Sequence, residues 1–184
     1  MKNSNIAIST IILTLLVASA NSSAADGTIN FVGTISSASC SVNSTAGSAS
    51  TTGSVDFGVV SSSSLSATGD ATVSAPFSIE LVDCGVTAAP QITFTGTPVT
   101  TSGYTELFAT EINGVGIRIE DAGRSGTYYS SGVSAANAGF GKIVSEDMTS
   151  ATGNFNAYLV SYNAGAKEGA IDTNVTFTID YSES

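Results

Sequence analysis

The chain has 184 residues with a net charge of −10, from 15 acidic and 5 basic side chains, and it contains no histidine. So few cations exclude a nucleic-acid-binding protein and disfavour attachment to anionic membranes. With 42% hydrophobic and only 11% charged residues, the composition also excludes a disordered chain and suits a single all-β extracellular domain.

The N-terminal 25 residues have the layout of a secretory signal peptide. A positive start at Lys2 precedes the apolar run Ile6–Ala20, and small residues follow it. The alternative is a membrane anchor, but the run is shorter than the ~20 residues that a spanning helix needs. We therefore expect residues 1–25 to be removed after export, with cleavage following Ala24 or Ala25.

The next stretch, Asp26–Ile35, alternates apolar or small residues with polar ones, apart from Val32. This period of two predicts a strand with one buried face. The residues of that face are Gly27, Ile29, Phe31, Gly33 and Ile35. Glycine in a strand often marks the close approach of another backbone. The stretch is therefore either an ordinary first strand or a strand that is placed into something else.

Cys40 and Cys84 are the two cysteines of the chain. In an exported protein an even cysteine number indicates a disulfide, and two cysteines allow one pairing. The chain-entropy relation gives this cross-link about 4 kcal/mol. Without histidine the pair is a poor zinc site and lacks the base that thiol catalysis needs. We expect neither a metal nor a cofactor.

Several short alternating segments follow, separated by turn-rich stretches, and they predict a β-sandwich. Asn154–Tyr162 has apolar residues on both faces, and Gly114–Glu120 directs Arg118 and Glu120 outward. One or two helical turns are expected only within Tyr104–Glu111. The predicted strands are Val55–Val60, Phe77–Cys84, Gln91–Thr95, Gly114–Glu120 and Asn154–Tyr162.

The last predicted strand, Ile171–Tyr181, has the most regular alternation in the chain. One face carries Thr173 and a set of apolar side chains, and the other carries Asp, Asn and Thr. The apolar set is Ile171, Val175, Phe177, Ile179 and Tyr181.

The order and spacing of these segments resemble a chaperone–usher pilin of the type 1 and P fimbrial class. The segments that carry the resemblance are GTINFVGTI before Cys40, VDFG at 55–58, FSIELVDC at 77–84, GVGIRIED at 114–121 and the ending FNAYLVSY to IDTNVTFTIDY. The resemblance covers essentially the whole mature chain. It implies an incomplete immunoglobulin-like sandwich that lacks its last strand, with an open groove beside Ile171–Tyr181.

The resemblance also implies how the domain is completed. A periplasmic chaperone lends a strand to the groove, and at an outer-membrane usher the N-terminal arm of the next subunit replaces it. The chain then divides into residues 26–35 as the arm and 36–184 as the pilin domain, in a homopolymer at the cell surface. Gly33 corresponds to a glycine that passes a tight part of the groove. Gly169 and Tyr181 correspond to a C-terminal glycine and tyrosine of the family, although Ser182–Ser184 follow Tyr181 here.

Other functions remain open from the residues alone. A stand-alone secreted immunoglobulin-like binding domain would pair the arm within its own molecule, and a minor linker subunit would share the pilin features. A glycoside hydrolase would need paired carboxylates; Asp56, Glu80, Asp83 and Glu120 are better interpreted as solvated side chains. Without histidine a Ser-His-Asp triad is excluded. A fimbria would serve cell adhesion, and its host receptor is not identified by the sequence.

Overall fold

The computed structural model describes residues 28–35, 40–84, 88–136, 140 and 150–183. The predicted signal peptide and Gly27 of the arm lie outside these residues. In the described part of the chain no helix is long and apolar enough to cross a membrane. The described elements are β1 (Thr28–Ile35), β2 (Ser41–Thr45), β3 (Thr52–Asp56), the short 3-10 helix η1 (Ser62–Leu65), β4 (Ala75–Val82), β5 (Ala88–Thr95), β6 (Phe108–Ala109), β7 (Val115–Asp121), β8 (Tyr128–Tyr129), β9 (Ser134–Ala136), β10 (Ser150–Ser161) and β11 (Asp172–Glu183).

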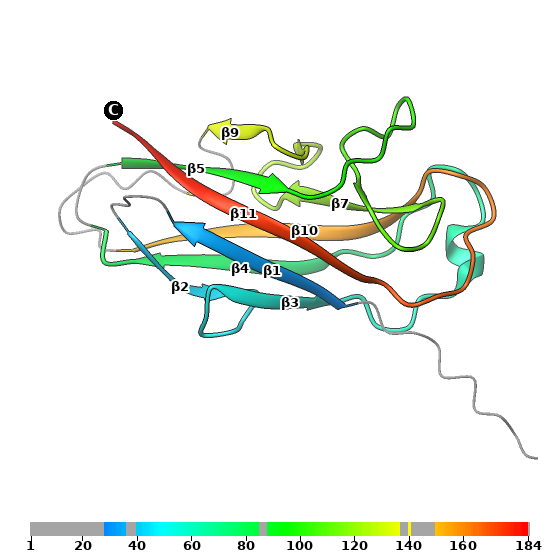
Figure 1. The fold of residues 1–184 in the computed structure, drawn as a ribbon, viewed down its shortest axis with the longest axis horizontal. Helices are drawn as coiled ribbons and strands as arrows, with labels where there is room; N and C mark the ends of the chain where they lie inside the picture. Colours follow the sequence, from blue (N-terminus) through cyan, green and yellow to red (C-terminus); the bar gives the residue numbers. More distant parts are fainter. Residues whose placement is uncertain (1–27, 36–39, 85–87, 137–139, 141–149, 184) are drawn as a thin grey trace, which may run out of the picture.

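The strands form two sheets that pack face to face as an immunoglobulin-like sandwich, which confirms the predicted fold class. One sheet has the order β3-β1-β11-β5-β9, and the other has the order β2-β4-β10-β7-β6, with β8 paired to β7. Figure 1 shows the two long strands β10 and β11 crossing the molecule in different layers. Alternation along each strand places one set of side chains between the sheets.

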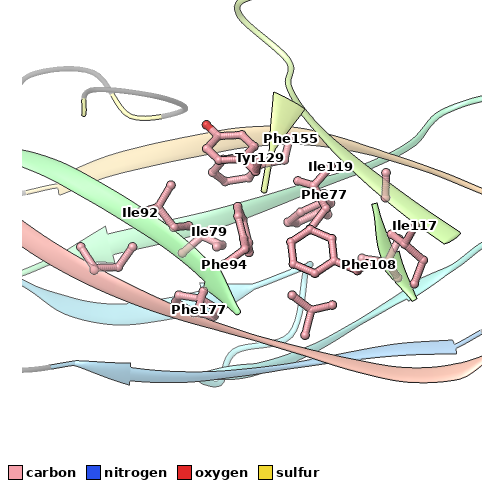
Figure 2. Close-up of a cluster of buried hydrophobic side chains, with 14 of the residues drawn as sticks. Phe77, Ile79, Ile92, Phe94, Phe108, Ile117, Ile119, Tyr129, Phe155 and Phe177 are labelled. Atoms are coloured by element: carbon pink, nitrogen blue, oxygen red, sulfur yellow. The ribbon is translucent and has the colours of Figure 1, made fainter. Parts of the chain in front are cut away.

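Aromatic rings from both sheets fill the centre of the sandwich. Phe77 on β4 stacks on Phe155 of β10 with ring centroids 5.2 Å apart, and Phe94 of β5 meets Phe155 edge-on at 5.4 Å. Figure 2 shows Phe94, Tyr129 and Phe155 together, with Phe177 of β11 reaching the same cluster. Offset and edge-on pairs add to the free energy of apolar burial. Both sheets therefore share one core.

Five of the six strands predicted after the N-terminal arm overlap the observed ones with ends shifted by at most four residues, and two predicted segments differ more. The strand predicted at Val55–Val60 runs instead from Thr52 to Asp56. It ends there because the Asp56 carboxylate accepts the Gly58 N–H at 2.7 Å and Gly58 turns with a φ of 62°. The helical turns expected within Tyr104–Glu111 are wrong: that segment holds a turn and the two-residue strand β6.

Candidate functional site

The inner face of β11 is fully buried along its centre. Val175, Phe177 and Ile179 are buried between the sheets, together with Ile171 and Thr173 towards the start of the strand. The opposite face, which carries Asp172, Asn174 and Thr176, is exposed. The alternation in the sequence thus correctly predicts which side of the last strand enters the core.

The two edges of β11 have different partners. On one edge β5 runs antiparallel over Thr176–Glu183. On the other edge β1 runs parallel over Asp172–Ile179 and separates β11 from β3, with which β1 pairs in the antiparallel sense. No other described strand pairs with β11 on this edge. We call the space between β3 and β11 the slot; in this structure the N-terminal strand of the same chain occupies it.

Each residue of β1 lies opposite a residue of β11 whose number has the same parity, odd opposite odd and even opposite even. Ile29 lies opposite Thr173, Phe31 opposite Val175, Gly33 opposite Phe177 and Ile35 opposite Ile179. The residues that the sequence assigned to the apolar face of the arm therefore share register with the inward-facing residues of β11. Gly33, the predicted close-approach position, is opposite the largest of them.

A carboxylate holds the start of β11 where β5 does not reach. Glu111 accepts the Asp172 backbone N–H at 3.1 Å and the Thr173 hydroxyl at 2.9 Å, both on Oε2. Burial raises the pKa of Glu111, but hydrogen bonds from its own backbone, Thr173 and Asp172 outweigh burial and lower that pKa overall. Sequence reasoning missed this residue because its partners are distant in the chain.

A depression of mixed polar and apolar lining lies beside β3. It has a volume of about 620 Å³ and is lined by the end of β3, the following loop and the approach to β4. Val73 is 90% exposed and Val59 is 66% exposed on its rim. Asp56, which pairs with Thr28 at the start of β1, is part of the lining. The depression therefore lies between β3 and the start of β4, on the side of β3 away from β11.

The end of the chain continues the ladder beyond the predicted strand. Tyr181 lies opposite Pro90, Ser182 opposite Ala89 and Glu183 opposite Ala88. The Tyr181 hydroxyl is buried without a hydrogen-bond partner among the described residues, and burial raises the pKa of Tyr181 to about 12. Two of the three residues after Tyr181 thus lengthen β11.

The structure gives no local reason for a glycine at position 169. Gly169 has ordinary negative φ, and an added Cβ would meet Ile112 at 3.4 Å, an ordinary contact.

The disulfide is confirmed. Cys40 and Cys84 are bonded and buried, with their Cα atoms 4.0 Å apart. Cys40 immediately precedes β2, and Cys84 follows β4 by two residues, so the bond joins the ends of two paired strands. It also fixes the point at which the chain leaves the N-terminal arm.

The carboxylates considered for hydrolysis have structural partners in separate places. Glu80 accepts the Asn43 amide N–H at 2.8 Å, Asp56 holds the Gly58 turn, and Glu120 accepts the Tyr158 hydroxyl at 2.6 Å. Among the described residues no three His, Cys, Asp or Glu side chains are grouped as metal ligands would be. Among the described residues the slot, which the N-terminal strand fills, is therefore the candidate functional site.

Addition of an extended strand to the open edge of a sheet is a recurring way in which β-proteins bind a partner chain. A family model described as "Fimbrial protein" matches residues 29–182, and the chain belongs to this family. The family is structural and not enzymatic, so the chain is a structural subunit of a surface fimbria that contacts other fimbrial subunits.

Solved structures agree with this assignment. An antigen and type I fimbria protein of Burkholderia pseudomallei is 27% identical with a TM-score of 0.55, over 86% of this chain and 99% of that one. The P pilus rod subunit PapA is 25% identical with a TM-score of 0.57, over 81% and 96%. The P pilus adaptor subunit PapF, at 17% identity and a TM-score of 0.52 over 78% and 95%, shares the fold. A search of curated protein sequences gave no significant match.

Proposed function

We propose that the chain is the repeating subunit of a fimbria and polymerises head to tail by donor-strand exchange. In this proposal residues 26–35 of one subunit enter the slot between β3 and β11 of the next subunit. A periplasmic chaperone supplies a strand to the slot during export, and an outer-membrane usher is the place of exchange. The assembled fimbria serves cell adhesion.

The observation that carries the proposal is the edge of β11. Among described strands it is paired only by β1, an N-terminal segment. A terminal strand can leave without breaking the connection between any other two elements. The vacated edge would expose backbone donors and acceptors beside an apolar interior, which an incoming strand satisfies at once.

The energy available to an incoming arm is large. Burying the side chains of Ile29, Phe31 and Ile35 in a neighbour would contribute roughly 1.5–3 kcal/mol each. Their total is comparable with the stability of a typical domain, roughly 5–15 kcal/mol. Because each subunit is both donor and acceptor, insertion does not close on itself and produces an open filament.

Deletion of Asp26–Gly33 tests the proposal. The variant should still be recovered as a folded complex with its chaperone and should accept a neighbour's arm. It should fail to insert into another subunit and should therefore terminate fibres, which electron microscopy and fibre length measure. A variant that cannot be recovered with the chaperone favours a stand-alone domain, and one that still forms long fibres excludes the arm as the donor strand.

Single substitutions in the arm provide a matched pair. Gly33→Leu should shorten fibres, because a large side chain replaces none where backbones approach closely. Thr34→Leu places the same side chain at the neighbouring position of opposite parity and should leave fibre length nearly unchanged. Equal effects of both changes would contradict the assignment of the odd positions to the inserted face.

A further inference from the structure

The chain carries both parts of the proposed contact, and in this structure they meet within one molecule. β1 lies in the chain's own slot, parallel to β11 over eight residues and antiparallel to β3 over five. We propose that this arrangement is a closed monomeric state that blocks the arm as donor and the slot as acceptor at the same time. This inference rests on the proposed function, because only a polymerising subunit has a donor and an acceptor to block.

The orientation of β1 follows from the short connection to Cys40. Cys40 is bonded to Cys84 and lies at the end of the sandwich where β11 finishes, since Ala88, four residues after Cys84, pairs with Glu183. Ile35 lies opposite Ile179 near that end. The five steps from Ile35 to Cys40 reach roughly 17 Å when fully extended. The closed state with β1 parallel to β11 satisfies this limit.

An arm that ran antiparallel to β11 in its own slot would exceed the limit. Its C-terminal end, Ile35, would lie near Thr173, six residues from Ile179 and thus roughly 20 Å farther from the disulfide. The connection cannot span this added distance. An antiparallel arm must therefore come from another molecule, so the direction of the arm distinguishes the closed monomer from an antiparallel donor strand in a fibre.

The closed state also competes well with exchange. Parallel pairing is slightly less stable per residue than antiparallel pairing. In the closed state β1 is parallel to β11 at eight positions, which favours its replacement by an arm antiparallel to β11. It is antiparallel to β3 at five positions, and an arm of reversed direction would lose this more stable pairing. The difference in pairing free energy between the two directions of the arm is therefore small. In contrast, a short tether gives the chain's own arm an effective concentration in the millimolar range. At lower subunit concentrations the closed monomer should therefore prevail, and a chaperone must occupy the slot before the arm does.

Cross-linking between paired cysteine substitutions distinguishes the two directions. In the closed state position 30 is opposite position 174. An antiparallel arm that keeps its odd positions facing inward pairs position 30 with an even position of β11. A register with position 30 opposite 174 would carry residues 33–35 past the start of β11 at Asp172, so the arm remains paired along its length only with position 30 opposite 176 or 178. The native cysteines do not interfere, since both are in the disulfide. The three test variants are Asn30→Cys with Asn174→Cys, with Thr176→Cys, or with Thr178→Cys.

The exported chain is purified without chaperone, diluted to micromolar concentration and treated with a mild oxidant. A disulfide requires Cβ atoms roughly 4 Å apart, so it forms between directly opposite positions and not between diagonal ones, which are roughly 7–8 Å apart. The 30/174 variant should cross-link within one molecule in most of the sample, and the 30/176 and 30/178 variants should not. The cross-linked 30/174 monomer should also fail to join growing fibres, whereas the same variant without cross-linking should join them. Absence of the 30/174 product, or an intramolecular 30/176 or 30/178 product, would overturn the closed state.

Fibres assembled with chaperone and usher separate this inference from the proposed function. There, a cross-link between subunits in the 30/176 or 30/178 variant is expected from donor-strand exchange. Its absence, with the 30/174 product still present in the monomer, would count against exchange and leave the closed state standing. The reverse result would remove the closed state and leave exchange intact.

Discussion

Strands β10 and β11 are alike in length and pattern but differ in what surrounds them. Each has 12 residues and buries an alternating set of apolar side chains. β10 is flanked by β4 and β7, both of which belong to the interior of the chain. β11 has β5 on one edge and, on the other, only the N-terminal strand β1. The two strands therefore differ in the chain connectivity of their neighbours and not in the pattern of their own side chains.

The surroundings of β10 are also fastened more firmly. The disulfide joins β4, its neighbour, to the start of β2. On the outer face the Tyr158 hydroxyl of β10 donates to Glu120 of β7, and the Gly126 N–H donates to the same carboxylate at 2.7 Å. β11 has the Glu111 carboxylate at its start. The molecule thus combines a fixed sheet, fastened by a disulfide and by side-chain hydrogen bonds, with a sheet in which β11 is bordered on one side by the N-terminal strand.

The largest effect is expected from a charge in the shared core. Phe177→Asp on β11 and Phe155→Asp on β10 should each cost several kcal/mol, because both rings are buried and an unpaired buried charge is strongly destabilising. Little folded subunit should be recovered from either variant when the exported protein is quantified. Asn174→Asp adds the same charge on the exposed face of β11 and should be recovered normally. Normal recovery of Phe177→Asp would show that β11 leaves the core in solution, and would contradict the view that β10 and β11 are equally buried.

Removal of the disulfide should have the next largest effect. Replacing Cys40 and Cys84 together by serine should lower the free energy of unfolding by about 4 kcal/mol, since the cross-link restricts the unfolded chain. Urea unfolding of the purified subunit measures this change, and thiol labelling of the native protein should detect no free cysteine. Equal unfolding midpoints for wild type and the double variant would mean that the fixed sheet does not depend on the bond.

The outer-face hydrogen bond should have a smaller effect. Tyr158→Phe removes the donor to the Glu120 carboxylate and should cost about 1–2 kcal/mol, as expected for a hydrogen bond to a charged group. Because the change lies between β7 and β10, fibre length should stay the same while the unfolding midpoint falls. Shorter fibres at unchanged stability would show that this face takes part in assembly.

The pH dependence sharpens the same prediction. Hydrogen bonds from Gly126 and Tyr158 hold the pKa of Glu120 below its ordinary value of 4.5. A carboxylate with a lowered pKa in the folded state contributes stability above its unfolded pKa and loses it as the pH falls through the folded value. Wild type should therefore lose more stability than Glu120→Gln between about pH 5 and pH 3. Parallel pH profiles would contradict this role of Glu120.

The sequence predicts those features that depend on local alternation. The strict period of two in β4 and β11 identifies their buried faces, and the even cysteine number identifies the disulfide. Features that depend on distant partners were not predictable. Glu120 has outward parity and was expected to be exposed, but it is buried because Tyr158 and the Gly126 turn cover it. Strands as short as β6, β8 and β9 are too brief to show a period.

The slot itself was predictable only in part. Alternation in residues 26–35 and in the last strand indicates two apolar faces that fit each other, and the register of β1 on β11 agrees with this pairing. Periodicity does not say whether the two faces meet within one molecule or between two. That choice depends on the length of the connection and on where the disulfide fixes Cys40, which are properties of the folded chain.

The position of Cys40 has a mechanical consequence for a fibre built by strand exchange. Tension applied along such a fibre would pull the inserted arm lengthwise against β11, so that the rungs of the ladder resist together in shear. Within each subunit the same force would travel from the arm into Cys40. There the disulfide passes it covalently to the end of β4, so that the five-residue strand β2 does not have to bear it by hydrogen bonds alone. The bond would act as the coupling between one unit of the fibre and the next.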